Sequence, residues 1–335
     1  MTAEAPHRRA TIMEVARLAG VSHQTVSRYF RDNASLKEAT RQRVDAAVRT
    51  LNYRPNLAAR SMRTRRTGRL AVVVPALAFS PARMLAGANE VAHAAEYGVD
   101  VLAIEGGVEA RTRRVLELAD SGQVDGIVSF APLMSGLEGA DTGTTILVTS
   151  EFDNEMRGIG ELADAAPVKD FVHHLAELGH TRFLHVTGDL SFASARARKR
   201  VFLQTLQELD LPTGVVFEGD WTAESGIAAM SSLDARNHPT AVIASNDLVA
   251  SGVVRGAHQR GWRVPDDISV TGWDKHPVGQ FLVPSLTTVD VELEQLGARA
   301  MRRLIAALRN ENPEPTSTPL HTVVWGESIG PAPQA

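Results

Sequence analysis

From Leu70 onward, short apolar segments alternate with segments whose apolar residues recur at helical spacing. The first apolar segment, LAVVVPAL, is followed by a helical pattern over about 81–97. Such alternation predicts parallel sheets with helices on both faces. About ten strands exceed what one compact sheet of this class usually carries, so we expect two similar lobes. The predicted strands are 70–77, 99–104, 126–130, 145–149, 183–187, 215–218, 241–244, 268–272, 284–291 and 323–325.

The segment TIMEVARLAGVSHQTVSRYF, residues 11–30, has a different pattern, in which two short helices meet at Gly20. Apolar residues at i, i+3, i+4 and i+7 predict a helix over 12–19, and a T-x-x-E capping box begins at Thr11. Gly20 suits the left-handed end of a helix, and Ser22 can cap the next helix. The spacing predicts a helix-turn-helix, although an ordinary helical hairpin with a polar face has the same pattern.

The second helix of this pair carries polar side chains on its outward face: His23, Gln24, Ser27 and Arg28. Such groups can hydrogen-bond to base edges or phosphates when the N-terminus of the helix enters a major groove. The distribution of charge along the chain also favours contact of this region with DNA. Residues 1–68 contain 14 lysines and arginines against 5 acidic residues, whereas the remainder contains 21 against 34. A basic head on an acidic body indicates that the head alone meets a polyanion.

A third helix is predicted over about 38–51, with an open choice at its start: Ser35 and Glu38 could form a capping box, or the helix could begin later. Residues 56–62, NLAARSM, follow as a helix too short to be stable alone, which we expect to order only on DNA and beside a second subunit. The expected boundaries are 1–55 for the helix-turn-helix domain, 56–67 for the hinge helix and linker, and 68–335 for the body, with lobes at 68–164 plus 292–320 and 165–291 plus 321–331.

Several protein classes are disfavoured by what the sequence lacks. There is no cysteine, no long apolar run and no apolar segment after the N-terminal charges, so a cytoplasmic protein without disulfides or a membrane span is the simplest interpretation. Phosphate-loop, zinc-protease and nucleophile-elbow motifs are also missing. His173, His174 and His180 diverge on a predicted helix and its end, so they do not converge on a metal. We expect no cofactor, no metal and no enzymatic activity.

Motifs over nearly the whole chain resemble the lactose-repressor (LacI/GalR) family. The head and hinge contribute TIMEVARLAGVSHQTVSR and LNYRPNLAARSM. The body contributes, in the order and spacing of the family, ELGHTRFLHVTG, GDLSFASARARKR, EGDWTAESG, ASNDLVASG, VPDDISVTGWD and PSLTTVDVELEQLG. The resemblance implies an all-α helix-turn-helix head joined by a hinge helix to a two-lobed α/β body with a periplasmic-binding-protein-like fold.

For the head, the resemblance implies that His23 and Gln24 read bases, with Arg28 as a third contact. Met62 stands where the family usually has a leucine that wedges into the central minor-groove step, and packing between paired hinge helices is its alternative role. The candidate DNA contacts are Thr11, Ser22, His23, Gln24, Thr25, Ser27, Arg28, Asn33, Tyr53, Asn56, Ala59 and Met62.

For the body, the resemblance implies an effector held between the lobes. Arg198 matches the main anchoring arginine, whose planar fork can hold two vicinal hydroxyls of a sugar. Trp221 matches an aromatic that stacks on a sugar ring or a base, and Phe79 would close the pocket from the other lobe. Structural roles are the alternative, such as helix capping by Asn246. The candidate effector contacts are Phe79, Ser129, Arg198, Trp221, Asn246 and Asp274.

The chain departs from the family pattern at two places. Residues 163–167, ADAAP, replace an Asp-Asn pair and a glycine, so the resemblance implies no acidic or amide contact from that loop. Val291 stands where glutamine often follows the Leu-Thr-Thr motif, which removes another polar contact. These changes indicate an effector different from the commonest ones of the family.

The sequence therefore predicts a ligand-responsive transcriptional repressor, with palindromic operator DNA, a small sugar and a second identical subunit as partners. A β-glucoside or β-galactoside would release it from DNA by favouring one lobe arrangement. A purine or nucleotide effector and an activator role are alternatives. A transport receptor for sugars would share the body without the basic head, and an NAD-dependent or sugar-modifying enzyme would need motifs that are missing. We expect a dimer rather than a tetramer because no heptad pattern follows the last strand.

Overall fold

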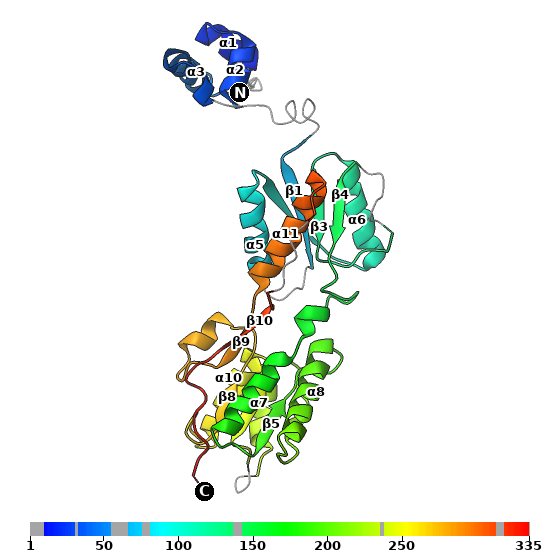
Figure 1. Cartoon of the computed structure of the whole chain (residues 1–335), viewed down its shortest axis with the longest axis vertical. Helices are drawn as coiled ribbons and strands as arrows, with labels where there is room; N and C mark the ends of the chain where they lie inside the picture. Colours follow the sequence, from blue (N-terminus) through cyan, green and yellow to red (C-terminus); the bar gives the residue numbers. More distant parts are fainter. Residues whose placement is uncertain are drawn as a thin grey trace, which may run out of the picture. The chain divides into compact units, whose positions relative to one another are not determined.

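The computed structural model describes residues 10–30, 33–54, 66–75, 81–136, 143–234, 238–312 and 318–334. The chain divides into two compact units, residues 1–67 and 68–335, which we call the head and the body (Figure 1). The predicted hinge helix lies outside the described residues. So do four candidate contacts, which are Asn56, Ala59, Met62 and Phe79.

The described part of the head consists of α1 (Ile12–Ala19), α2 (His23–Tyr29), the short 3-10 turn η1 (Asn33–Ser35) and α3 (Glu38–Thr50). The capping box at Thr11 is present, and Gly20 ends α1 with φ of 63°. α3 follows the later of the two predicted starts, because Lys37 rather than Ser35 precedes its first residue as the cap. The small core consists of Val15, Ala16, Ala19, Val26, Val44 and Ala47.

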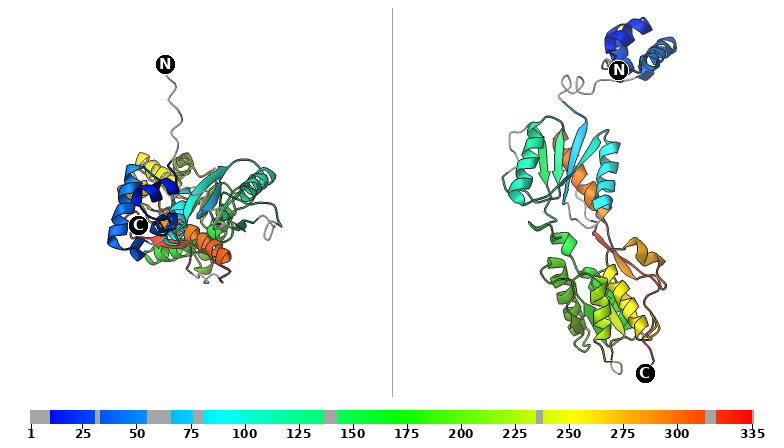
Figure 2. Two further views of the ribbon diagram at one scale, coloured as in Figure 1. Left: turned by 90° about the horizontal axis from the view of Figure 1, so that it is seen from above. Right: turned by 180° about the vertical axis from the view of Figure 1, so that it is seen from behind.

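The first sheet of the body is parallel with the order β2-β1-β3-β4. Its strands are β1 (Arg69–Pro75), β2 (Gly98–Ile104), β3 (Gly126–Ser129) and β4 (Thr145–Val148). Helices α5 (Pro81–Ala94) and α11 (Leu293–Arg309) cover one face and α6 (Val108–Asp120) covers the other, as Figures 1 and 2 show. Alternate residues of β1 explain this: Leu70 and Val72 join the core under α5 and α11, while Ala71 and Val73 join the core under α6.

The second sheet has the equivalent parallel order β6-β5-β7-β8. Its strands are β5 (Phe183–Val186), β6 (Val215–Phe217), β7 (Ala241–Ala244) and β8 (Ser269–Thr271). Its helices are α7 (Ala166–Glu177) and α8 (Ala193–Glu208) on one face, and α9 (Ala223–Ser231) and α10 (Asp247–Gln259) on the other. The prediction of two similar α/β lobes is confirmed.

The chain passes from the first sheet to the second through residues 150–165, which include the turn η2 (Gly160–Ala163). It returns through β9 (Thr288–Val291) to α11 and passes back through β10 (His321–Val324), which pairs with β9 in antiparallel fashion. One apolar cluster extends from both lobes into these connections, through Trp273, Val289 and Leu320. Among the described residues, no helix is both long and apolar enough to cross a membrane.

Several predicted element ends differ from the structure, and two of these differences have a clear local cause. The helix predicted over 81–97 stops at Ala94, because Glu96 takes a left-handed φ of 64° and the Tyr97 amide bonds back to Ala92. The strand predicted over 284–291 pairs only from Thr288, because the Leu286 amide donates to Gly279 in a loop.

Candidate functional site

The recognition face of the head lies on α2. Ser22 caps this helix by accepting a hydrogen bond from the Thr25 amide at 3.1 Å, and its hydroxyl lies 2.9 Å from that of Thr25. Val26 has no exposed surface, which fixes the rotation of the helix. His23, Gln24 and Arg28 are consequently exposed, and Ser27 is partly exposed. The first turn of α2 therefore offers free donors and acceptors to a groove.

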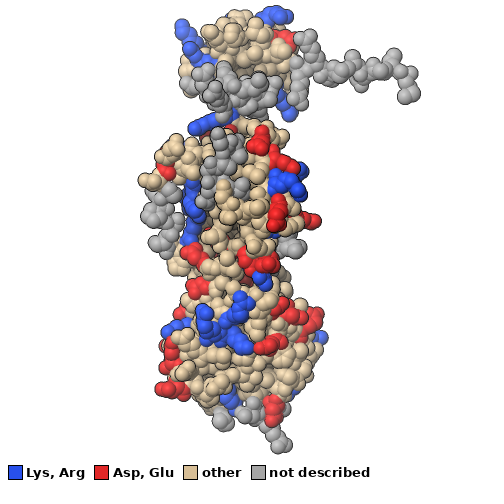
Figure 3. Space-filling view, turned by 90° about the vertical axis from the view of Figure 1, so that its right-hand side faces the viewer, with Lys and Arg blue, Asp and Glu red and all other residues tan. Residues whose placement is uncertain are grey.

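Contacts with α3 hold α2 at a fixed angle. The Tyr29 hydroxyl donates to the Asp45 carboxylate, and the Phe30 ring lies 5.6 Å from the Tyr53 ring, between centroids. Tyr53 and Thr11 thus have structural roles, Tyr53 by packing and Thr11 by capping α1. Asn33 is exposed in η1. Lysines and arginines occur on the face of the head drawn in Figure 3, while acidic and basic side chains are interspersed over the body.

The candidate effector contacts of the second lobe gather at one edge of its sheet. Trp221, Asn246 and Asp274 each follow the carboxyl end of a strand, namely β6, β7 and β8. Arg198 lies on α8, the helix that follows β5. Because the strands are parallel, these four side chains share the edge at which open α/β sheets bind ligands. The sequence prediction named these residues separately, and the fold brings them together.

Arg198 is the centre of this cluster. Its side chain is only 6% exposed, its Nη1 donates to the Ser245 carbonyl, and its Nε has no partner among the residues that the structure describes. The guanidinium carbon lies 5.7 Å from the centroid of the Trp221 ring and 3.8 Å from that of the Trp273 ring. Burial lowers the pKa of Arg198 to about 10, while the Asp274 charge opposes this shift. Arg198 therefore stays charged at neutral pH and keeps unused donor capacity.

Trp221 and Asn246 are joined by a hydrogen bond, in which the Asn246 Nδ2 donates to the Trp221 carbonyl at 3.3 Å. Asn246 also caps α10, since its Oδ1 accepts from the Val249 amide at 2.8 Å. Trp221 adopts a left-handed φ of 73°, and its indole nitrogen is buried without a partner from the described ranges of the chain. A Cβ on Gly188 would lie 2.3 Å from the Trp221 ring, so only glycine fits beside it. Asn246 thus combines the predicted capping role with a position in the cluster.

Asp274 belongs to a loop with two consecutive left-handed residues, at φ of 95° for Asp274 and 48° for Lys275. The Asp274 amide donates to the Val289 carbonyl at 3.0 Å, which fastens the loop to β9. Burial raises the pKa of the Asp274 carboxyl, and the nearby Arg198 charge opposes this. The carboxyl remains partly exposed and has no hydrogen bond among the described residues, so it offers an acceptor beside the guanidinium.

Ser129 is placed differently. It ends β3 in the first sheet, has no exposed surface, and its hydroxyl donates to the Ala131 carbonyl at 2.7 Å. The structure therefore does not bring Ser129 into the second-lobe cluster. Its role in effector binding stays a prediction without geometric support.

Sequence reasoning missed two residues beside this cluster. Trp273 is 1% exposed and packs against the Arg198 guanidinium. Asp247 is 4% exposed, accepts hydrogen bonds from the Thr288 hydroxyl and the His276 amide, and has its pKa raised to about 6, chiefly by burial. Each is adjacent in sequence to a predicted contact, Asp274 or Asn246. That adjacency, at the carboxyl end of a strand, is the signal that could have found them.

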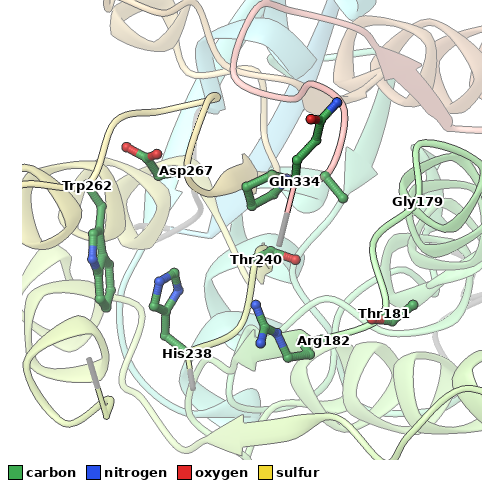
Figure 4. Close-up of a pocket in the computed structure, with 10 residues that line it drawn as sticks. Gly179, Thr181, Arg182, His238, Thr240, Trp262, Asp267 and Gln334 are labelled. Atoms are coloured by element: carbon green, nitrogen blue, oxygen red, sulfur yellow. The ribbon is translucent and has the colours of Figure 1, made fainter. Parts of the chain in front are cut away.

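A separate cavity of about 430 Å³ opens at the opposite, amino-terminal edge of the second sheet (Figure 4). Its lining includes Arg182, Thr240 and Asp267, which precede strands, together with His238 and Trp262. The His238 ring stacks on Trp262 with centroids 4.0 Å apart, and the Arg260 guanidinium lies over the same indole. The aromatic wall is therefore already covered by the protein itself.

Comparison with known proteins gives the chain a family. Residues 11–56 match the model of the bacterial regulatory proteins of the lacI family, and residues 172–329 match a periplasmic binding protein-like domain. The chain is 30% identical to catabolite control protein A of Priestia megaterium, over 90% of this chain and 93% of that protein. It is 31% identical to the lactose operon repressor of Escherichia coli (strain K12), over 88% of this chain and 84% of the repressor.

A solved structure agrees with these matches. The Lac repressor bound to ONPG in the repressed state superposes with a TM-score of 0.74 at 29% identity, over 96% of this chain and all of that one. The predicted family and fold class are thus confirmed: this chain belongs to the lacI family of bacterial regulatory proteins.

Proposed function

We propose that this protein is a transcriptional repressor that binds a palindromic operator as a homodimer and is released by a small sugar. The observation that carries the proposal is the combination of an exposed polar recognition face on α2 with a buried Arg198 whose donors are not saturated. The first feature suits DNA and the second suits a hydroxyl-rich ligand. A protein that joins both can respond to the ligand by changing its affinity for DNA.

The recognition face supports direct base readout. Gln24 is exposed in the first turn of α2, where an amide can bond to two positions of an adenine, and Arg28 can reach phosphates or guanine. Residues 1–68 have 14 basic against 5 acidic residues, although acidic residues outnumber basic ones in the whole chain, so phosphate contacts of the head would supply the non-specific part of the affinity.

The effector cluster supports a sugar. A guanidinium with a free Nε–H, a carboxylate and an aromatic ring are the groups that hold vicinal hydroxyls and the apolar face of a pyranose. The lactose operon repressor is among the relatives, and ONPG occupies the matched Lac repressor structure. Val291 is 8% exposed and offers no hydrogen bond, so the effector differs from ligands that need an amide at this position.

An apolar surface beside the cluster supports dimerisation. Phe281 and Val283 are 83% and 94% exposed, and Val278 of the same loop and Leu248 of α10 are also exposed apolar side chains. Bulky apolar residues clustered in this way are typical of a surface that a partner covers. We propose that a second copy covers it, because a palindromic operator requires a two-fold protein. Sedimentation equilibrium would then give a dimer for the wild type and a monomer for Phe281→Asp.

The decisive experiment measures operator binding and effector release with one preparation. Operators are first selected from random DNA, and affinity is then followed against salt concentration and against a panel of β-glucosides, β-galactosides and purine bases. We expect a steep loss of affinity with salt and release by a sugar. A salt-independent affinity would rule out docking on phosphates, and release by a purine alone would replace the sugar with the alternative effector class.

Base readout is tested by Gln24→Ala against Gln42→Ala, a matched change of an exposed glutamine on α3. We expect Gln24→Ala to weaken the selected operator about tenfold while affinity for unrelated DNA changes little, since one bidentate contact supplies about 1–3 kcal/mol of discrimination. Gln42→Ala should change neither. Equal losses on both DNAs would mean that Gln24 positions the head instead of reading bases.

A further inference from the structure

The Arg198 guanidinium lies against the face of Trp273. The distance from its carbon to the ring centroid is 3.8 Å, shorter than the 5.7 Å to the Trp221 ring. A guanidinium that pointed an N–H bond at the ring would hold its carbon a bond length farther away than the nitrogen. The short distance therefore requires the flat group to lie nearly parallel to the indole.

This contact is important for the orientation of the Arg198 guanidinium, because few other contacts restrain it. Among the described residues, no carboxylate forms an ion pair with it, and its one hydrogen bond runs to the Ser245 carbonyl. Nε is left without a partner. A buried cation in this situation gains from an aromatic face, because the ring quadrupole attracts it without using its N–H donors. Stacking thus leaves those donors for a ligand.

Within the described part of the chain, the indole nitrogen of Trp273 also has no partner, although the side chain is 1% exposed. Buried tryptophans usually satisfy this N–H. The contact that Trp273 makes in the cluster is therefore made by its ring face. The backbone carbonyl of Trp273 accepts a hydrogen bond from the Asp247 amide at 2.8 Å. This hydrogen bond connects the backbone of Trp273 to the first turn of α10, next to Asn246.

We propose that Trp273 is a positioning residue for the effector, which fixes the plane of the Arg198 guanidinium. The inference rests on the proposed effector site and deepens it. Because all guanidinium donors lie in one plane, a guanidinium held flat on the indole donates hydrogen bonds to ligand oxygens only in that plane. The site therefore selects ligands that can place two acceptor oxygens in the guanidinium plane, as a pair of vicinal hydroxyls can.

The geometry is tested without any effector by NMR of protein labelled with 15N-arginine. The signal that disappears in Arg198→Lys identifies the Arg198 Nε–H, which ring current from Trp273 should shift upfield. Trp273→Phe keeps an aromatic face and should keep the shift in that direction, whereas Trp273→Leu should move the signal toward the position of exposed arginines. A signal that is unshifted in the wild type, or is unmoved in Trp273→Leu, would overturn the stacked geometry.

The effect on binding is tested by titrating ONPG and methyl β-glucoside into the full chain. Trp273→Leu should lower the affinity for whichever sugar binds by about tenfold, and Trp273→Phe should lower it by less than about threefold. In the Arg198→Lys background, where no planar group remains, Trp273→Leu should cause little further loss of sugar affinity. An equal loss in both backgrounds would show a merely structural role and refute positioning. If neither sugar binds the wild type, the proposed effector class fails, while the NMR result still decides the geometry.

Discussion

Replacement of Arg198 by methionine tests whether this buried residue serves the fold or the effector. Burial lowers the pKa of Arg198 from its ordinary value to about 10. At about 1.4 kcal/mol for each pKa unit, the buried charge costs the folded state about 3 kcal/mol. The sign follows from the depressed pKa: the folded state holds this proton less tightly than the unfolded chain, so the whole cost is present at neutral pH and begins to disappear only as the pH rises through about 10.

The contacts of Arg198 offset much of that cost. One charged hydrogen bond to the Ser245 carbonyl contributes about 1.5–3 kcal/mol, and stacking on Trp273 contributes about 1 kcal/mol. Arg198→Met removes the cost and the contacts together, so we expect the free energy of unfolding of the body to change by less than about 1 kcal/mol. Truncation of a buried structural side chain would instead cost about 2–5 kcal/mol.

The assay is urea unfolding followed by circular dichroism, together with a fluorescence titration of the effector identified from the sugar panel. Arg200→Met is the matched control, because Arg200 is exposed on the same helix. We expect near-normal stability for both variants and loss of the fluorescence response in Arg198→Met alone. A loss of stability above about 2 kcal/mol combined with an intact effector response would refute the reasoning and assign Arg198 to the fold.

Three further outcomes follow from the structure. Burial lowers the pKa of His185 to about 4, so the unfolded chain takes up a proton first and the folded state loses stability as the pH drops from 6.5 to 4. His185→Phe should remove about 2 kcal/mol of this loss at pH 5, and an unchanged pH profile of the free energy of unfolding would contradict the burial of a neutral His185. Gly188→Ala should displace the Trp221 ring, shift its fluorescence and weaken the effector about tenfold or more, whereas normal binding would show that the ring is dispensable. Gly87→Ala should destabilise the body by about 1–3 kcal/mol in urea unfolding, because a Cβ there lies 1.8 Å from the Glu294 carbonyl oxygen, and unaltered stability would mean that α5 and α11 separate at no cost.

Much of the fold could be predicted because periodicity and capping are local signals. The Thr11 capping box, Gly20 and Ser22 define α1 and α2 without reference to the rest of the chain. The buried parallel strands are continuous apolar runs, such as LAVVVPAL, that contrast sharply with the helices between them. Element ends were less predictable, as at Glu96, since a left-handed conformation of a non-glycine residue depends on tertiary contacts.

The effector cluster was predictable only in part. Position after a strand and family resemblance together indicated Asn246 and Asp274, whereas family resemblance alone indicated Arg198 on α8. The strand-end position also marks Trp273 as a neighbour of the cluster, but neither signal shows its role, because that role comes from a distance of 3.8 Å between residues 75 positions apart in the chain. Ser129 shows the opposite case, since its strand-end position is right while its hydroxyl is already used by the backbone. Sequence position thus identifies the edge of the sheet, and packing decides which side chains there remain free.

Two ion pairs of Asp290 link the effector cluster to the first lobe. The Lys275 ammonium donates to Asp290 of β9 at 2.7 Å, and the other oxygen of Asp290 accepts from Arg83 of α5 at 2.9 Å. Although burial favours the neutral acid, these two cations lower the pKa of Asp290, so the bridge is charged at neutral pH. A ligand that contacts Asp274 therefore acts on a loop whose next residue is fastened, through one buried carboxylate, to a helix of the other lobe. This chain therefore has a direct physical connection between the loop at Asp274 and the first lobe, and the effect of a ligand on it is limited by the ligand's difference in affinity between the two lobe arrangements.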